Sequence, residues 1–86
     1  MKFYKKEKIY LVLKVGNEYL ANVWEEHNDE VDNVEFTEYL EEAMTFKQNK
    51  APKYLPVNTL EEMCEYLNGK LVTVRKRTVI EEIDPT

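Results

Sequence analysis

Apolar side chains alternate with other residues from position 9 to position 15, in the stretch I-Y-L-V-L-K-V. This period of two is typical of a β-strand. Gly16-Asn17 follows, and a second apolar stretch then runs from position 19 to position 24. Because a two-residue Gly-Asn connection supplies the positive φ angles of tight turns, the sequence predicts an N-terminal β-hairpin and hence an antiparallel sheet.

Two short helices are expected after this hairpin. Thr37 can cap the first, which begins near Glu38 and whose acidic residues lie where a helix N-terminus favours negative charge. The second has a clearer pattern, since apolar side chains recur at i, i+3, i+4 and i+7 in Leu60, Met63, Cys64 and Leu67. Asn58 or Thr59 can cap it, and Asn68-Gly69 can end it.

Two further strands complete the expected fold. Val34 to Phe36 is a short one, and the last begins at Lys70 and reaches Arg75, with a less regular continuation toward Ile83. No Gly/Ser-rich linker or internal repeat divides the 86 residues. We therefore expect one α+β domain over residues 1–86, a mostly antiparallel β-sheet packed against two short helices. The helix stripe should face Ile9, Leu11 and Leu13.

The net charge of −5 is distributed unevenly along the chain. Residues 1–14 carry five lysines and one Glu, a charge of +4, and residues 15–46 carry ten acids and no Lys or Arg. Residues 47–86 carry seven bases and six acids. Such asymmetry bears on partners and steering rather than on fold.

The centre of the negative block is W-E-E-H-N-D-E-V-D-N-V-E-F-T-E, residues 24–38. A metal site would combine His27 with its neighbouring carboxylates, but residues 29–35 lack the glycine and the ligand spacing of a calcium loop. Cys64 lies on the apolar face of a helix, which is typical of a core residue. We therefore expect no metal and no cofactor.

Several functional classes are disfavoured. The chain has one His and two Gly, so neither a Ser/His/Asp arrangement nor a glycine-rich phosphate loop is present, and we expect no enzyme. Lys2, Lys5, Lys6 and Lys8 would join residues 75–77 in one basic patch if the first and last strands are neighbours. However, a pI of about 4.9 argues against direct nucleic-acid binding, and solubilising charges are the simpler interpretation. No apolar stretch is long enough to cross a membrane, and a single cysteine favours the cytoplasm.

The phrases F-T-E-Y-L-E-E-A-M-T-F (residues 36–46) and L-N-G-K-L-V-T-V (residues 67–74) resemble those of small accessory proteins of bacteriophages and prophages of Gram-positive bacteria. The resemblance covers roughly residues 9 to 75 and consists of scaffold residues. It implies a phage source and a location in the host cytoplasm rather than a particular activity. The inserted K-Q-N-K-A-P-K-Y-L-P-V and the enlarged acidic loop depart from this pattern.

Two functional hypotheses follow from these observations. In the first, the protein is a small acidic binding protein that inhibits or modulates a host protein by occupying its basic surface. A nucleic-acid-binding defence enzyme is one example of such a host protein. Carboxylates on a rigid scaffold can replace phosphates against Lys and Arg. The expected partner-binding residues are Trp24, Glu25, Glu26, Asp29, Glu30, Asp32, Glu35 and Glu38. In the second, the chain is an assembly component that forms a homo-oligomer, and the acids only keep it soluble.

Overall fold

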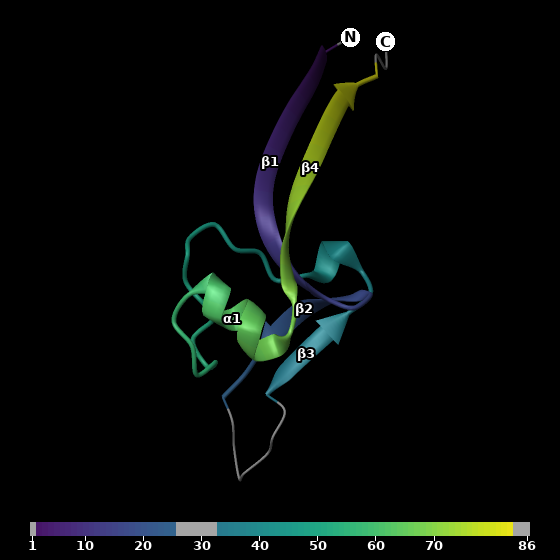
Figure 1. Cartoon of the computed structure of the whole chain (residues 1–86). Coiled ribbons are helices and arrows are strands. Elements are labelled where there is room, and N and C mark those ends of the chain that lie inside the picture. The colour runs from purple at the N-terminus through teal and green to yellow at the C-terminus, as the bar shows by residue number, and fades with distance from the viewer. Residues whose placement is uncertain (1, 26–32, 84–86) are drawn as a thin grey trace.

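In the computed structural model, which describes residues 2–25 and 33–83, four strands form one antiparallel sheet in the order β3-β2-β1-β4 (Figure 1). The elements in chain order are β1 (Lys2–Val15), β2 (Glu18–Val23), β3 (Val34–Thr37), the 3₁₀ turn η1 (Leu40–Glu42), α1 (Leu60–Leu67) and β4 (Lys70–Glu82). The antiparallel sheet predicted from the sequence is confirmed, and the fold is mostly β.

The N-terminal hairpin forms at the expected residues. Val15 pairs with Glu18 and Lys14 pairs with Tyr19 across the turn. Gly16 has a φ of 62°, whereas no positive φ occurs at Asn17, so only the first turn residue needs glycine. That distribution is the one of a type II′ hairpin turn.

The longest pairing joins the first and last strands, which lie side by side from Lys2 opposite Glu82 to Lys14 opposite Lys70. The last strand thus continues well past Arg75. Beyond the body of the molecule the two strands project as a curved two-stranded ribbon (Figure 1). We call residues 2–9 and 75–82 the arm. It extends the molecule to 62 Å in length against 24 and 23 Å in the other directions.

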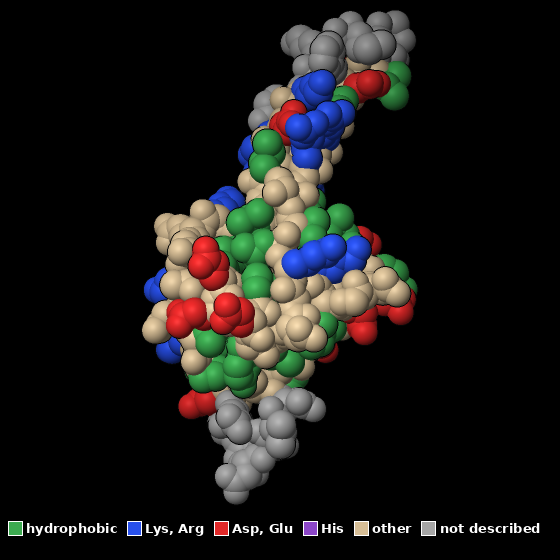
Figure 2. Space-filling view, in the orientation of Figure 1, with side chains coloured by type: hydrophobic (Ala, Val, Ile, Leu, Met, Phe, Trp, Pro, Cys, Tyr) green, Lys and Arg blue, Asp and Glu red, His purple; other side chains and the backbone are tan. Residues whose placement is uncertain are grey.

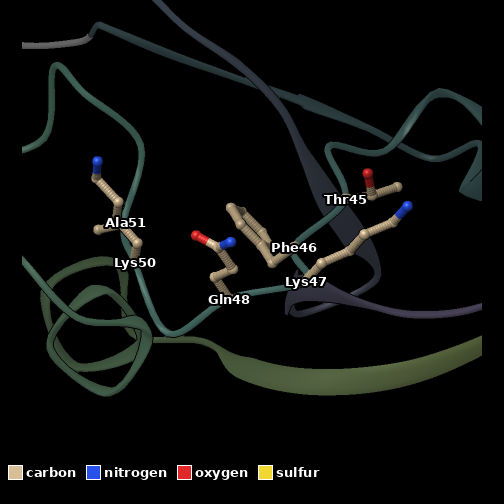
Figure 3. A pocket seen from close by; sticks show the side chains of 6 residues that line it. All are labelled: Thr45, Phe46, Lys47, Gln48, Lys50 and Ala51. Atoms are coloured by element: carbon tan, nitrogen blue, oxygen red, sulfur yellow. The ribbon is translucent and has the colours of Figure 1, made fainter.

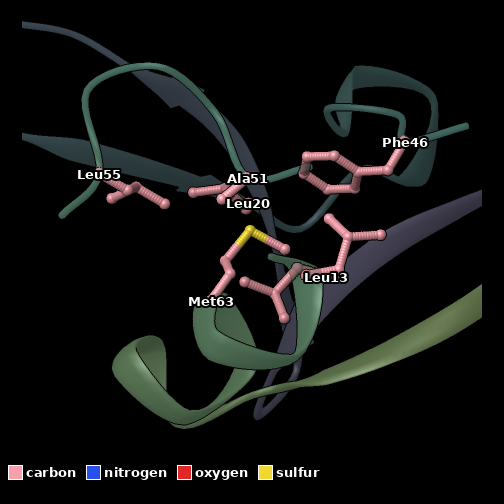
Figure 4. Close-up of a cluster of buried hydrophobic side chains, with 7 residues drawn as sticks. Leu13, Leu20, Phe46, Ala51, Leu55 and Met63 are labelled. Atoms are coloured by element: carbon pink, nitrogen blue, oxygen red, sulfur yellow. The ribbon is translucent and has the colours of Figure 1, made fainter. Parts of the chain in front are cut away.

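The core lies between the sheet and α1 (Figure 4). Leu13, Leu20 and Met63 are completely buried at its centre, and Phe46, Ala51, Leu55 and Leu60 complete the buried cluster. The predicted contact between the helix stripe and β1 is therefore confirmed at Leu13. It is wrong at Ile9, which lies in the arm and is 60% exposed.

Helix α1 begins and ends where the sequence indicates. The Thr59 hydroxyl accepts a hydrogen bond from the backbone N–H of Glu62, and the Glu62 carboxylate accepts one from the backbone N–H of Thr59. This reciprocal capping box satisfies donors that a helix N-terminus leaves unpaired. Asn68 adopts a left-handed conformation at the C-terminal end, with φ 57° and ψ 47°.

The helix predicted to begin near Glu38 is wrong, because only the three-residue turn η1 forms there. Thr37 does not cap η1, whose N-cap is Tyr39, but its hydroxyl accepts a hydrogen bond from the backbone N–H of Tyr39 in a local turn. The chain then becomes extended, because Met44 donates its N–H to the carbonyl of Leu20 and Phe46 exchanges two hydrogen bonds with Leu11. These contacts with β2 and β1 outweigh the local helix propensity. The domain consequently has one short α-helix rather than two.

Candidate interaction surfaces

The described part of the predicted acidic surface lies along β3, an edge strand, and at its two ends. Glu25, Glu35 and Glu38 are exposed, and Trp24 is 38% exposed. We call these four residues the acidic edge. The other predicted partner-binding residues, Glu26, Asp29, Glu30 and Asp32, lie outside the described residues.

Asn33, which precedes β3, is hydrogen-bonded to Trp24, which follows β2, and to Tyr54 of the body. Its side-chain amide donates hydrogen bonds of 3.1 Å to the carbonyls of Trp24 and Tyr54, and its own carbonyl accepts one of 3.0 Å from the Trp24 N–H. Asn33 is only 8% exposed. The Trp24 backbone is therefore held at one end of β3. The sequence offered no signal for this role, because Asn33 looks like one more polar residue of the loop.

The other end of β3 is fixed by η1. The Thr37 hydroxyl donates a 3.0 Å hydrogen bond to the Glu42 carboxylate, which holds this turn against the strand end. Tyr39 and Leu40 next to it are 59% and 37% exposed. Carboxylates thus lie here next to exposed aromatic and aliphatic side chains.

Most basic side chains lie on the arm. The sequence predicted one basic patch if the first and last strands are neighbours, and β1 and β4 do pair. Residues 2–9 and 75–82 carry seven Lys or Arg and three Glu, so the arm has a charge of +4. In Figure 2 a cluster of Lys and Arg side chains lies on the arm, whereas most Asp and Glu side chains in this view lie over the body. The uneven charge of the sequence thus becomes a separation in space.

Within the described residues the only ion pair joins Arg75 Nε to Glu7 Oε1, at 2.9 Å, on one face of the arm. The opposite face is lined by Lys6, Lys8 and Lys76 together with Thr78. The two faces of the arm therefore differ in charge. An ion pair neutralises part of the positive charge on the first face, whereas the lysines on the second face have no such ion pair within the described residues.

One hollow, of about 360 Å³, is lined by residues between Thr45 and Ala51 and is open to solvent (Figure 3). Its lining contains no arrangement of catalytic groups. Among residues 2–25 and 33–83, no group of three or more His, Cys, Asp or Glu side chains is placed to hold a metal ion. No helix in the described part of the chain has the length and apolar character needed to span a membrane.

The lone thiol does not form part of a reactive site. Cys64 is half-buried on α1 and packs against the core. Burial raises the pKa of its thiol, and the acidic side chains of Glu61 and Glu65 raise it further. Because the thiolate is the reactive form, Cys64 is poorly nucleophilic at neutral pH. This agrees with the structural role that its position in the sequence indicates.

Comparisons of the chain with protein-family models, with curated proteins and with solved structures found no match.

Proposed function

We propose that this chain is a small non-enzymatic binding module whose acidic edge contacts a basic surface of a protein partner. The observation that carries the proposal is the placement of three exposed carboxylates, Glu35 on the edge strand β3 and Glu25 and Glu38 near its two ends, with half-exposed Trp24 beside Glu25. None of the three carboxylates forms an ion pair within the described residues. Their charges are therefore available to a partner.

The physical basis is steering followed by local contact. An acidic surface accelerates encounter with a basic one and orients it, and the gain depends on ionic strength. Trp24 supplies the apolar area that a stable interface needs at its centre. The Asn33 hydrogen bonds hold the Trp24 backbone in place before binding, which reduces the backbone entropy lost on association. With the phage source that the resemblance implies, the partner is a host protein, and a nucleic-acid-binding defence enzyme is one with a suitable basic surface.

A charge-reversal pair tests this proposal once a partner has been recovered from a Gram-positive host lysate. E25K/E35K/E38K reverses the acidic edge, and E18K/E61K/E65K makes the same charge change at exposed positions elsewhere. The first variant should bind the partner with an association rate reduced about tenfold and less dependent on salt. The second should bind like the wild type. Equal rates for wild type and E25K/E35K/E38K would exclude the acidic edge as the binding surface.

Homo-oligomeric assembly is the second candidate, and one observation favours it. The arm exposes Ile9, Val79 and Ile80 on two strands that no other described element covers, and exposed Ile83 directly follows β4. An unpaired strand edge with apolar side chains is a site where another chain can add. Size-exclusion chromatography with light scattering decides between the candidates. A stable ring or dimer that V79K/I80K dissociates would support assembly, and a monomer would support the binding module.

A further inference from the structure

The two faces of the arm follow from the register of β1 and β4, because residues directly opposite each other share a face of the sheet. Glu7 lies opposite Arg77 and Ile9 opposite Arg75, on the face that contains the ion pair. On the other face the partners are Lys6 with Thr78 and Lys8 with Lys76. Two lysines directly opposite each other repel, so this pairing opposes the stability of the ribbon.

A second facing lysine pair shows how such repulsion can be relieved. Lys14 lies opposite Lys70 near the hairpin, but the Lys14 ammonium sits over the Tyr19 ring, 5.9 Å from its centroid. A cation over an aromatic face is attracted to it. Lys8 and Lys76 have no ion-pair partner within the described residues. An anion from outside the chain would supply the missing counter-charge.

The face of the arm that carries Lys6, Lys8 and Lys76 continues onto the body of the molecule. Lys8 and Lys76 line two adjoining hollows: one also holds Lys6 and Thr78, and the other holds Tyr10, Glu41, Ala43, Thr45 and Lys47. Figure 3 shows the Lys47 side chain extending toward Thr45, away from Lys50. We call Lys6, Lys8, Lys47 and Lys76 the basic track. Glu41 is the one acid that lines it, and Glu41 forms no ion pair with any of these lysines.

We propose that the basic track binds the phosphodiester backbone of a nucleic acid. The lysines are spread along two strands and onto the body, so each can meet a different phosphate of an extended polyanion. The hydroxyls of Tyr10, Thr45 and Thr78, which line the same hollows, are further donors to phosphate and sugar oxygens. A two-stranded ribbon also has dimensions that enter the major groove of a duplex.

The net charge of −5 does not oppose this proposal. Exposed charges are screened over about 8–10 Å at ordinary ionic strength. The molecule is 62 Å long, and its acidic edge follows β3, which β2 separates from β1 and which β2 and β1 separate from β4. A phosphate at the arm therefore meets a local charge of +4 rather than the charge of the whole chain.

Fluorescence anisotropy with labelled oligonucleotides of about 16 nucleotides tests the proposal, with single-stranded DNA, single-stranded RNA and duplex DNA as separate probes. Four phosphate contacts predict that log K falls with log salt with a slope of about −3 for a single strand, which means about 50-fold weaker binding at 200 mM than at 50 mM salt. Saturable binding with this slope to a single strand, or with a slope of about −3.6 to duplex DNA, supports the site, and the ratio of affinities identifies the preferred form.

The two facing lysine pairs supply a matched set of variants. K8Q/K76Q removes two charges from the basic track, and K14Q/K70Q removes two charges from the same strands beside the hairpin. The first should reduce the slope by about 1.4 and weaken binding about tenfold at 50 mM salt, whereas the second should leave the slope unchanged. Circular dichroism melts establish that both variants are folded.

Three results would overturn the proposal. One is the absence of binding to all probes at 50 mM salt, and another is an equal loss in K8Q/K76Q and K14Q/K70Q. The third is displacement of the oligonucleotide by polyglutamate at equal charge concentration, which would assign the track to an acidic protein segment. Because the variants leave the acidic edge intact, failure here is distinguishable from failure of the proposed protein-binding function.

Discussion

Gly69→Ala should destabilise the protein through a steric clash rather than through backbone conformation. A Cβ at this position would lie 2.7 Å from the carbonyl oxygen of Lys14 and 2.7 Å from Cγ2 of Val15. The Val15 methyl group can move, but the Lys14 oxygen belongs to the backbone of β1, which β2 and β4 hold on both sides. Overpacking of this kind costs about 1–3 kcal/mol. In a domain of this size each kcal/mol lowers the melting temperature by about 4–8 °C.

Urea unfolding followed by circular dichroism measures this loss, and Gly16 provides the control. A Cβ on Gly16 would meet nothing within 4 Å, but its φ of 62° disfavours any side chain. A clash grows with the size of the side chain, so Gly69→Ser should cost more than Gly69→Ala. A conformational penalty depends mainly on having a Cβ, so Gly16→Ser and Gly16→Ala should cost about the same. A loss below about 0.5 kcal/mol for Gly69→Ala would show that the approach of β4 to β1 is not rigid.

Three further predictions concern α1. Met63→Ala should cost about 2–5 kcal/mol in urea unfolding because Met63 is completely buried, whereas half-buried Leu67→Ala should cost less; the reverse order would contradict the helix orientation. The pKa of Glu62 is lowered by hydrogen bonds from the backbone and side chain of Thr59, so its contribution to stability is present above about pH 4.5 and is lost as pH falls through the lowered pKa. The stability difference between wild type and E62Q should accordingly shrink in thermal melts at acidic pH. Since the pKa of Cys64 is raised, iodoacetamide should alkylate the native protein slowly at neutral pH and rapidly once urea unfolds it.

The parts of the fold that the sequence predicted correctly depend on nearby residues. The hairpin requires a turn residue with positive φ between two alternating stretches, and α1 requires a capping box, an apolar stripe and a left-handed end. Residues 38–46 carry an equally plausible helix pattern, yet Met44 and Phe46 bond to β2 and β1 instead. A single sequence does not reveal that competition, because the partners lie more than twenty residues away.

The same limit applies to the candidate surfaces. The excess of acids in residues 15–46 can be counted in the sequence, so the acidic edge was predicted. The basic track depends on the register that places Lys8 opposite Lys76, and the sequence does not reveal the register of strands whose paired residues are 68 positions apart. The exposure of Ile9 was also not predictable, because Ile9 continues the apolar alternation of β1 beyond the part of the strand that α1 covers.

Stability alone does not account for the composition of the arm. An isolated two-stranded ribbon is marginal in water because each strand has an unpaired edge and little apolar area is buried. The arm adds a facing pair of like charges, Lys8 and Lys76, to this marginal element. A bound polyanion would reverse the balance, since a ligand that binds only the folded ribbon stabilises it in proportion to its occupancy. Under the proposal of a nucleic-acid site, the lysines would weaken the arm in isolation and strengthen it in a complex, whereas charges that only keep the protein soluble would have no such effect.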